Sequence, residues 1–473
     1  MSKAKCIMVQ GTMSGAGKSL LCAALCRIFA QDGYRVAPFK SQNMALNSFV
    51  TRDGLEMGRA QVVQAQAAGI EPDVRMNPIL LKPSSDVGSQ VIVNGEVRGQ
   101  MPAAAYFKMK RALIPEILSA YNSLAETVDI IVIEGAGSPA EINLKADDIV
   151  NMGLARLEPE ERARIKGLLI NKFRGDVEIL RPGLAMLEEK TQLPVLGVVP
   201  YLKVDIEDED SLSTRLDAGK TVHPLDAAIL RLPHISNFTD FMPLEQHPLL
   251  GVRYVQNTRQ LGTPDLVILP GTKNTVDDLL WLRQSGLEAA LLKLAASGTP
   301  VLGVCGGYQM LGETLADPEG TESGTAQTVR GLGLLPTHTV FTGQKHRTQD
   351  TAAVIAAPFA GAALTGYQIH TGRTEVQGVP FCTLADGTPE GCVQDNVFGT
   401  YLHGLFDTGA LTEKLVALLC RRKGIAPDSA ALIPMEQYRQ QQFDLLADGV
   451  RGALDLDAVY AAMGLENPRR NAQ

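Results

Sequence analysis

The sequence predicts an α/β protein with at least two domains, each built around a largely parallel β-sheet. The chain has 473 residues, which is more than one hydrophobic core normally holds. In both halves, short apolar segments rich in β-branched residues alternate with amphipathic helical segments, as in parallel sheets that are covered by helices. Two of the apolar segments end in a glycine-rich turn, one starting at Gly11 and one at Cys305. Turns of this kind place a binding or reacting group at the carboxyl end of a strand.

The first turn has the pattern of a phosphate-binding P-loop. The predicted strand Cys6–Gln10 leads into Gly-Thr-Met-Ser-Gly-Ala-Gly-Lys-Ser at residues 11–19, and a helical pattern continues to Ala30. The backbone N–H groups of such a loop surround phosphate oxygens, its lysine neutralises the β- and γ-phosphates, and its serine hydroxyl binds Mg²⁺. A glycine-rich turn with a chance Lys-Ser pair fits the flanking strand and helix less well. The predicted nucleotide contacts are Gly11, Thr12, Ser14, Gly15, Gly17, Lys18 and Ser19.

Further strands are expected in the N-terminal half at Tyr34–Lys40, Ser89–Val93, Asp129–Glu134, Gly167–Phe173 and Pro194–Pro200. Helical segments separate several of them, which predicts a mostly parallel sheet, and Asn94-Gly95 predicts a hairpin turn in an added flap. Glu134 ends its strand and is expected to hold Mg²⁺ or its water beside Ser19; a capping or surface carboxylate is the alternative. The closely spaced amides and hydroxyls of Lys40–Ser48 either position an acceptor or form a plain loop.

The second glycine-rich turn has the features of a nucleophile elbow. The β-rich segment Pro300–Val304 ends at Cys305, and Gly306 and Gly307 follow at once. Glycine tolerates the strained backbone of such a turn, and the N-terminus of the next helix favours thiolate over thiol. A lone cysteine in an apolar run is usually an inert core residue. However, His403 ends another apolar segment, and a nucleophile and a base from separate strand ends are what covalent acyl chemistry requires.

Other strands of the C-terminal half are expected at Ala228–Leu232, Gly251–Val255 and Asp265–Leu269. The loop Pro270–Thr275 follows the last of these strands. The N–H groups of Gly271, in this loop, and of Gly306 are predicted to form an oxyanion hole. Two amphipathic helical patterns, Leu411–Lys423 and Met435–Met463, are expected to pack against a domain rather than to take part in chemistry.

Composition and charge restrict the class of protein. The net charge of −8, without a basic block, argues against nucleic acid or an anionic membrane as a partner. No apolar run reaches the length of a membrane span, and the N-terminus shows no signal-peptide pattern. The seven cysteines form no CxxC pair, which indicates reduced thiols rather than disulfides or a zinc site. A cytoplasmic protein is therefore expected, and the acidic run Asp205–Asp210 is interpreted as a solvated linker or helix start.

The motifs together resemble a known enzyme family. The Cys305 turn and His403 resemble class I glutamine amidotransferase domains, which have a flavodoxin-like sheet. The P-loop, one residue longer than the standard consensus, resembles those of dethiobiotin synthetase-like proteins. In combination, and over nearly the whole chain, they resemble the cobyric acid synthase family of the cobalamin pathway. The resemblance rests on both turns and on residues 39–48, 134–144, 148–155, 170–176 and 235–240. Residues 39–48 distinguish the chain from the sister a,c-diamide synthases.

The resemblance implies an ATP-dependent amide synthetase domain at residues 1–222, a glutamine amidotransferase domain at 223–410 and a helical extension at 411–473. L-Glutamine would acylate Cys305 while His403 transfers the proton, and the released ammonia would reach the P-loop domain. There, ATP with Mg²⁺ would convert a carboxylate of the corrin substrate into an acyl phosphate, which ammonia turns into an amide. The family amidates the b, d, e and g carboxylates of adenosylcobyrinic acid a,c-diamide to give adenosylcobyric acid. The alternatives are amidation of another acid, such as cobyrinic acid or a cell-wall precursor, and nucleotide or corrin binding without catalysis.

Three positions depart from the patterns of relatives. Class I amidotransferases have a glutamate two residues after the histidine, but Leu405 stands there, as it does in the family resembled. This predicts a Cys–His dyad in which a carbonyl or a water orients the imidazole. Gln368 replaces a glutamate, which weakens the case for a supporting carboxylate there, and His370 is either structural or functional. After Arg156, a buried parallel strand of the relatives is missing. Either the sheet closes over the gap, or the synthetase half is impaired, or the sequence contains an error.

Overall fold

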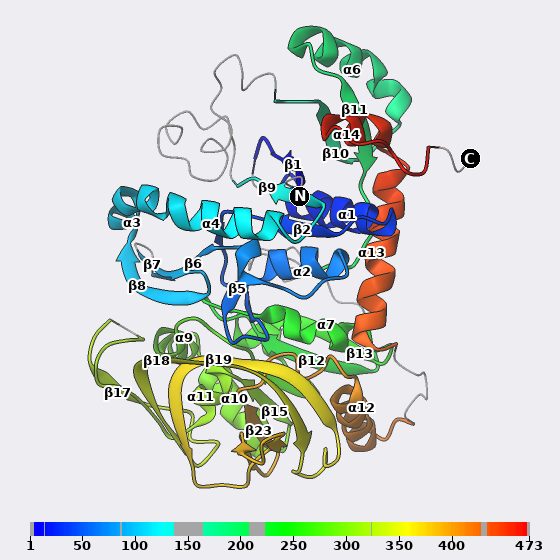
Figure 1. The fold of residues 1–473 in the computed structure, drawn as a ribbon. Helices are drawn as coiled ribbons and strands as arrows, with labels where there is room; N and C mark the ends of the chain where they lie inside the picture. Colours follow the sequence, from blue (N-terminus) through cyan, green and yellow to red (C-terminus); the bar gives the residue numbers. More distant parts are fainter. Residues whose placement is uncertain are drawn as a thin grey trace. The chain divides into compact units, whose positions relative to one another are not determined.

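The structure is a computed structural model and describes residues 4–13, 15–85, 88–136, 164–207, 223–322, 324–426 and 433–470 (Figure 1). By their contacts, the residues form two compact units. Unit 1 comprises Met1–Ala45, Glu56–Glu207 and Arg439–Gln473, and unit 2 comprises Leu46–Leu55 and Asp208–Tyr438. Each unit therefore combines segments from distant parts of the sequence. The C-terminal residues belong to unit 1, and a short segment of the N-terminal half belongs to unit 2.

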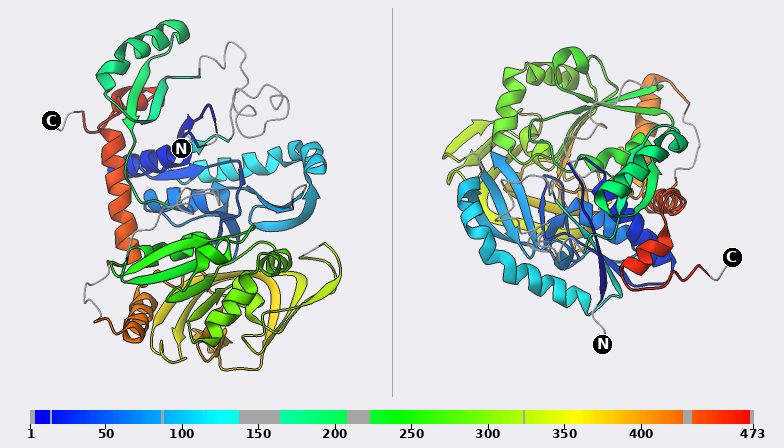
Figure 2. Two further views of the ribbon diagram at one scale, coloured as in Figure 1. Left: turned by 180° about the vertical axis from the view of Figure 1, so that it is seen from behind. Right: turned by 90° about the horizontal axis from the view of Figure 1, so that it is seen from above.

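Unit 1 contains the parallel sheet that the sequence predicts around the P-loop. Its elements are β1 (Lys5–Val9), α1 (Lys18–Gln31), β2 (Val36–Phe39), α2 (Arg59–Ala67), β9 (Ile130–Glu134) and α13 (Met435–Arg451). The strand order is β2-β9-β1, and both pairings are parallel. β2 and β9 are buried along their whole length, because apolar residues of α1, α2 and α13 form one core with them. Figures 1 and 2 show α1 and α13 side by side.

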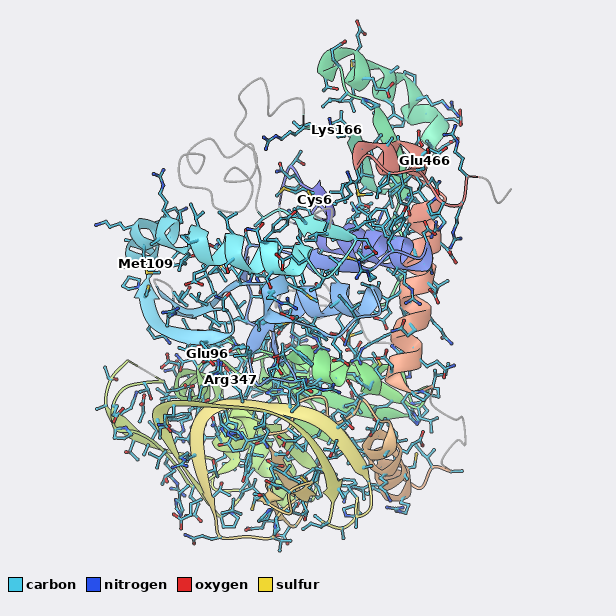
Figure 3. The ribbon with its side chains drawn as sticks, viewed as in Figure 1. Cys6, Glu96, Met109, Lys166, Arg347 and Glu466 are labelled. Carbon is cyan, nitrogen blue, oxygen red and sulfur yellow. The ribbon has the colours of Figure 1, made fainter. Side chains whose placement is uncertain are left out.

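A second, two-stranded parallel sheet lies in the same unit. It consists of β10 (Leu168–Phe173) and β11 (Val195–Pro200), which are connected by α6 (Val177–Thr191). Both strands were expected, but in the part of the chain that the structure describes β10 does not pair with β1, so the sheet of unit 1 is in two pieces. Most residues of β10 and β11 are only half-buried, and Lys5 and Cys6 of β1 are exposed. Cys6 is labelled in Figure 3. The missing strand between β1 and β10 stays a prediction. Arg156, where the gap is predicted, lies outside the described residues.

The flap predicted from Asn94-Gly95 is confirmed and forms a small sheet of its own. Its strands β6 (Ile79–Ser85), β7 (Gly88–Val93) and β8 (Glu96–Pro102) are antiparallel, and β3 (Gln42–Met44) joins β6 in parallel. Asn94 and Gly95 have φ angles of 48° and 81°, as a tight hairpin turn requires. The remaining elements here are β5 (Glu56–Gly58), η1 (Val74–Met76), α3 (Ala103–Met109), η2 (Lys110–Leu113) and α4 (Ile114–Ala125).

Unit 2 is built on a six-stranded sheet in the order β13-β12-β14-β15-β23-β22. These strands are β12 (Leu225–Leu230), β13 (Leu250–Val255), β14 (Leu266–Leu269), β15 (Val301–Val304), β22 (Cys392–Gln394) and β23 (Val397–Thr400), and only β22 is antiparallel to its neighbour. The helical elements are η5 (Phe238–Phe241), α7 (Met242–Glu245), α8 (Thr258–Leu261), α9 (Thr275–Gln284), α10 (Leu287–Ala296), α11 (Gly306–Leu311) and α12 (Ala410–Lys423). β14, β15 and β23 are fully buried, which explains their continuous apolar runs. Because β15 and β23 are neighbours, the residues that follow them meet at one edge of the sheet.

A second sheet of unit 2 was not predicted from the sequence. It is dominated by the long antiparallel pair β18 (Thr337–Val354) and β19 (Ala363–Val376), drawn in yellow tones in Figure 1. β16 (Thr314–Asp317), β17 (Gln327–Arg330), β20 (Cys382–Leu384) and β21 (Pro389–Glu390) extend it, and β4 (Ser48–Val50) is a further strand of the unit. β18 alternates between exposed and half-buried residues over much of its length, so it lacks the apolar run that marks the other strands.

Two expectations about peripheral segments need correction. The pattern Met435–Met463 is two helices, α13 and α14 (Leu456–Ala462), because the chain turns at Gly452 and Asp455 caps α14 by accepting a hydrogen bond from the Ala458 N–H. Of the acidic run at 205–210, residues 208–210 lie outside the described residues, but Glu207 is not solvated, since its side chain is only 3% exposed. Its carboxylate binds Arg59 at 2.5 Å and Arg439 at 2.9 Å. Among the described residues, no helix is long and apolar enough to cross a membrane.

Candidate active sites

Cys305 lies at the turn between the buried strand β15 and helix α11, as the sequence predicts. Its backbone has φ 51° and ψ −110°, a conformation that a non-glycine residue rarely adopts. Glycines stand at the closest contacts of this turn. A Cβ atom added at Gly307 would lie 2.1 Å from the carbonyl oxygen of Leu269, and one added at Gly303 would lie 2.8 Å from that of Gly307. The predicted elbow geometry is confirmed, and it holds Cys305 at the carboxyl end of β15.

His403 follows β23, so it comes from the strand next to the one that ends at Cys305. Tyr367 on β19 holds its backbone: the His403 N–H donates to the Tyr367 carbonyl at 2.8 Å, and the Tyr367 N–H donates back at 3.2 Å. The two rings stack with centroids 5.2 Å apart. Cys305 lies close enough to His403 to raise the pKa of the imidazole, and its Sγ donates to the carbonyl of Ile369 at 3.6 Å. The structure thus brings together the two residues that the sequence predicts as base and nucleophile.

A carboxylate orients the imidazole of His403, which corrects the expectation of a carbonyl or a water. Nδ1 of His403 lies 2.7 Å from Oδ2 of Asp240, and Oδ1 of Asp240 accepts a hydrogen bond from the Gly404 N–H at 3.1 Å. The His403 and Asp240 side chains are only 1% and 5% exposed. Asp240 lies on η5, between β12 and β13, whereas Leu405 is part of the hydrophobic core. The acidic partner of the histidine therefore comes from a different element than in ordinary class I amidotransferases.

Asp240 also sets the charge of this histidine. Burial by itself would lower the pKa of His403, but the negative charge of Asp240, together with hydrogen bonds to Asp240 and Cys305, raises it to about 10. His403 is therefore a cation at neutral pH and can give a proton to a group bound beside Cys305. His370 differs: burial lowers its pKa to about 3, and its ring stacks on Tyr401 at 3.7 Å. It is neutral and packed, which favours the structural interpretation of His370.

The two predicted oxyanion residues lie beside the catalytic pair. A Cβ atom added at Gly271 would lie 3.0 Å from Cε1 of His403, so this backbone passes directly against the imidazole. One added at Gly306 would lie 3.1 Å from the backbone nitrogen of Thr272. The loop after β14 and the first residue of α11 therefore approach each other next to Cys305. Their role as oxyanion donors stays a prediction.

Polar side chains that the sequence analysis did not single out extend from the elbow. Gln309 lies on α11, one helical turn after Cys305. Its Oε1 accepts a hydrogen bond from the Thr275 hydroxyl at 3.0 Å, and its Nε2 donates to the Tyr401 hydroxyl at 3.1 Å. The Tyr401 hydroxyl also forms a hydrogen bond with the Thr374 hydroxyl at 2.5 Å. In the sequence, the only indication of this network was that Gln309 follows Cys305 by one helical turn and so lies on the same side of α11.

The P-loop of unit 1 has the predicted strand–turn–helix form. Gly15 and Gly17 adopt φ angles of 75° and 89°, and α1 begins at Lys18, directly after Gly17. Lys18 Nζ donates to the carbonyl of Met13 at 3.1 Å, and its side-chain carbons pack on Gly11, where an added Cβ atom would lie 3.0 Å away. Thr12 lies in the described part of the loop, whereas Ser14 lies outside the described residues.

Comparison with known proteins decides the family. Residues 7–213 match the model of the CobQ/CobB/MinD/ParA nucleotide-binding domain, and residues 226–411 match that of the CobB/CobQ-like glutamine amidotransferase domain. A cobyric acid synthase of Lachnoclostridium phytofermentans is 52% identical over 97% of this chain and 99% of its own length. Those of Ruminiclostridium cellulolyticum and Citrobacter koseri are 50% and 49% identical, over 98% and 97% of this chain and 98% of their own lengths.

This chain belongs to the cobyric acid synthase family. The predicted fold class, a P-loop domain joined to a glutamine amidotransferase domain, is confirmed, and so is the enzyme class of a glutamine-dependent amide ligase. The alternatives that the sequence left open are not favoured. The alignment with the first of these relatives spans 511 positions, more than the 473 residues of the chain. The family member from L. phytofermentans therefore has residues without a counterpart here.

Glu134 ends the buried strand β9 and contacts Ser19 of the P-loop. Its side chain is 1% exposed, and Oε1 accepts hydrogen bonds from the Ser19 hydroxyl at 2.8 Å and from Lys40 Nζ at 2.9 Å. Oε2 accepts one from Gln64 Nε2 at 2.6 Å. A hydroxyl and a carboxylate are oxygen ligands of the kind that Mg²⁺ prefers. The donor set fits the ion, and the alternative of a surface carboxylate is wrong for Glu134.

Two residues of β10 complete the surroundings of the P-loop. Asn171 Nδ2 donates to the carbonyl of Ala16 at 2.8 Å, and Lys172 Nζ donates to that of Gly15 at 2.8 Å. Both belong to the segment 170–176 that carries the family resemblance, although their role could not be predicted. These contacts place β10 beside the phosphate loop even though it does not pair with β1.

Proposed function

We propose that this enzyme amidates the b, d, e and g carboxylates of adenosylcobyrinic acid a,c-diamide to give adenosylcobyric acid. Glutamine hydrolysis in unit 2 supplies the ammonia. In unit 1, each carboxylate takes the γ-phosphoryl group of ATP, with ADP leaving, and ammonia then displaces phosphate from the acyl phosphate to give the amide. Family membership supports the reaction, and one observation supports the assignment of the glutamine site: Cys305 and His403 meet at the ends of two neighbouring strands, with Asp240 behind the histidine.

The proposed roles in glutamine hydrolysis follow from this arrangement. The Cys305 thiolate attacks the side-chain amide carbon of glutamine beside the His403 cation. His403 then gives its proton to the departing nitrogen, which leaves as ammonia, and neutral His403 takes a proton from the water that hydrolyses the thioester. The N–H groups of Gly271 and Gly306 are proposed to stabilise the oxyanion in both steps. Asp240 keeps the imidazole in place and stabilises its cationic form.

The proposed roles in unit 1 concern phosphate and metal binding. The P-loop residues Gly11–Ser19 surround the phosphates of ATP with backbone N–H groups, and Lys18 neutralises their charge. Ser19 and Glu134 would hold Mg²⁺, which supplies charge neutralisation at the phosphates. Among the described residues, no three His, Cys, Asp or Glu side chains form a metal cluster, so phosphate oxygens and water would complete the coordination. A cytoplasmic location is proposed because all seven cysteines are free.

Replacing the proposed nucleophile tests the assignment. The Cys305→Ala variant should lose glutamine-dependent amidation, because no thioester can form, and should keep amidation with ammonium as the nitrogen source. Product formation from the a,c-diamide with ATP is measured by mass spectrometry of the amidated corrins. The matched control is Cys420→Ala, a buried cysteine on α12 that should keep both activities. Equal retention of both activities in Cys305→Ala would refute the assignment of the nucleophile. Amidation of cobyrinic acid, but not of the a,c-diamide, would refute the proposed substrate.

A further inference from the structure

Leu46–Leu55 belongs to unit 2, although the residues on both sides of it, up to Ala45 and from Glu56, belong to unit 1. We call it the inserted segment. We propose that the inserted segment positions Asp240 and His403 for glutamine hydrolysis and thereby makes this hydrolysis depend on the synthetase half of the chain. The proposal rests on the function proposed above, because that function assigns Cys305 and His403 to glutamine hydrolysis.

The first contact of the inserted segment is a reciprocal pair of asparagines. The Asn237 N–H donates to Oδ1 of Asn47 at 2.7 Å, and the Ser48 N–H donates to Oδ1 of Asn237 at 3.1 Å. All three residues are buried, so these hydrogen bonds are shielded from water. Asn237 has a φ angle of 53° and directly precedes η5, whose third residue is Asp240. The Asp240 N–H also donates to the Asn237 carbonyl at 3.0 Å. The inserted segment thus fixes the start of the turn that presents Asp240 to His403.

The second contact reaches His403 from the other side. The Tyr367 hydroxyl donates to the carbonyl of Ser48 at 3.1 Å, and the Phe49 ring packs edge-on against the Tyr367 ring with centroids 5.2 Å apart. Tyr367 is the residue that exchanges backbone hydrogen bonds with His403 and stacks on its imidazole. Gln349 of β18 adds a hydrogen bond to the carbonyl of Val50 at 2.7 Å. Residues 47–50 of the inserted segment therefore contact both Tyr367, which orients His403, and Asn237, which begins the turn that carries Asp240.

The sequence connects the inserted segment directly to the nucleotide site of unit 1. Only six residues separate Lys40 from Asn47. Lys40 Nζ binds Glu134, the carboxylate that also accepts from Ser19 of the P-loop. When ATP and Mg²⁺ bind at the P-loop, the charge around Glu134 changes, and Lys40 must adjust to it. A shift of Lys40 acts on the backbone that leads into the inserted segment, which gives the synthetase half a means to influence His403.

Asn237 allows a matched pair of variants that isolates one hydrogen bond. Asn237→Gly removes the oxygen that accepts from Ser48 but keeps the positive φ angle, which glycine tolerates. Asn237→Asp keeps an acceptor oxygen at the same place. Glutamate release from glutamine is measured with and without ATP plus the a,c-diamide, and amidation with ammonium is measured in parallel. In the full-length Asn237→Gly variant, we expect the glutamine-dependent rate to fall about 10-fold or more, as for groups that orient a reacting residue.

The other readouts distinguish positioning from general damage. Amidation with ammonium should stay within about 2-fold of wild type, and Asn237→Asp should recover most of the glutamine-dependent rate. ATP plus the a,c-diamide should stimulate glutamate release in wild type, and Asn237→Gly should lose this stimulation. Tyr367→Phe removes only the hydroxyl that donates to Ser48, and it should lower the glutamine-dependent rate and the stimulation in the same direction.

Several results would overturn the proposal. They are an Asn237→Gly variant with wild-type glutamine-dependent activity, equal losses with glutamine and ammonium, and wild-type glutamate release that ignores ATP and corrin. Failure of the proposed function looks different: wild type would then release glutamate or bind ATP without amidating the a,c-diamide from either nitrogen source. In that case the rate of glutamate release alone still tests whether Asn237 positions His403.

Discussion

Asp240 determines both the orientation and the charge of His403, so its carboxylate should control how glutamine hydrolysis depends on pH. The pKa of His403 is raised to about 10, so the imidazolium that gives its proton to the departing nitrogen persists until the pH rises through that value. In Asp240→Asn the amide still contacts the ring, but its charge is gone and burial dominates, so the pKa of His403 must fall. We expect the rate of glutamine hydrolysis near neutral pH to drop on the order of 100-fold. We also expect the alkaline limb of kcat/KM to move to lower pH.

The measurement is glutamate release over a range of pH for wild type and Asp240→Asn. The ionisation of glutamine itself affects both profiles equally, so the difference between the profiles reports on the enzyme alone. Amidation with ammonium at one pH is the control, and it should be retained because the change lies in unit 2. An unchanged alkaline limb would show that Asp240 does not set the charge of His403.

At the residue scale, the sequence was sufficient to predict that Cys305 and His403 lie at neighbouring strand ends, but not which residue contacts the imidazole. Cys305 and His403 stand out because each follows an apolar run, and the paired glycines after Cys305 have no other simple explanation. Asp240 lies in a segment that carries the family resemblance, yet its contact with His403 depends on a turn between β12 and β13. The signal was indirect: Leu405 leaves the histidine without its usual partner, so another group has to orient the imidazole. Sequence periodicity cannot say which one.

At the scale of elements, Glu207 connects helices α2 and α13 of unit 1, and its removal should destabilise that unit. Burial would raise the pKa of Glu207, but the charges of Arg59 and Arg439 lower it to about 2. Its contribution to stability is therefore present above its unfolded pKa of about 4.3 and is lost as the pH falls through about 2. In Glu207→Gln, two buried arginines lose their counter-charge, and we expect unit 1 to lose about 3 kcal/mol of unfolding free energy at pH 7.

Urea unfolding followed at pH 7 and at pH 3 checks this prediction. The difference between wild type and Glu207→Gln should shrink at the lower pH, because the unfolded carboxyl is then protonated and part of the advantage is lost. Glu189→Gln, a change at an exposed position on α6, is the matched control and should have little effect. A Glu207→Gln variant as stable as the control would mean that the ion pairs contribute nothing.

The elements that could be predicted are those with a strong local signal. Buried strands such as β9 and β15 are continuous apolar runs, and the flap turn is marked by Asn94-Gly95. β18 and β19 lack that signal, because their alternating half-exposed residues are held by pairing with each other rather than by burial on both faces. The pattern Met435–Met463 was read as one helix because its apolar spacing continues past Gly452, where the chain turns.

At the scale of the whole molecule, the fold class and the family followed from the order of motifs along the chain, but the composition of the units did not. Leu46–Leu55 belongs to unit 2 and Arg439–Gln473 belongs to unit 1 because of tertiary contacts, and these cannot be predicted from a local sequence pattern. In the described residues, the sheet of unit 1 is divided between β1 and β10. Residues 137–163, which include the position of the predicted gap, lie outside the described residues, so the gap stays a prediction.

This divided sheet should make unit 1 the less stable part of the chain. β1, β10 and β11 are at most half-buried along most of their length, whereas β14, β15 and β23 of unit 2 are buried completely. Half-buried strands contribute less apolar burial and expose unpaired backbone groups. We expect calorimetry to show two unfolding transitions, with unit 1 unfolding at the lower temperature. ATP with Mg²⁺ should raise only this lower transition temperature, because at 100 times the Kd the ligand adds about 2.7 kcal/mol to the unfolding free energy of unit 1. Lys18→Ala, which removes the phosphate-binding lysine, should abolish this increase without changing the upper transition.

If ATP instead raised the upper transition, or if amides of β1 and β10 exchanged hydrogen as slowly as those of β15, the division of the sheet would have no energetic consequence.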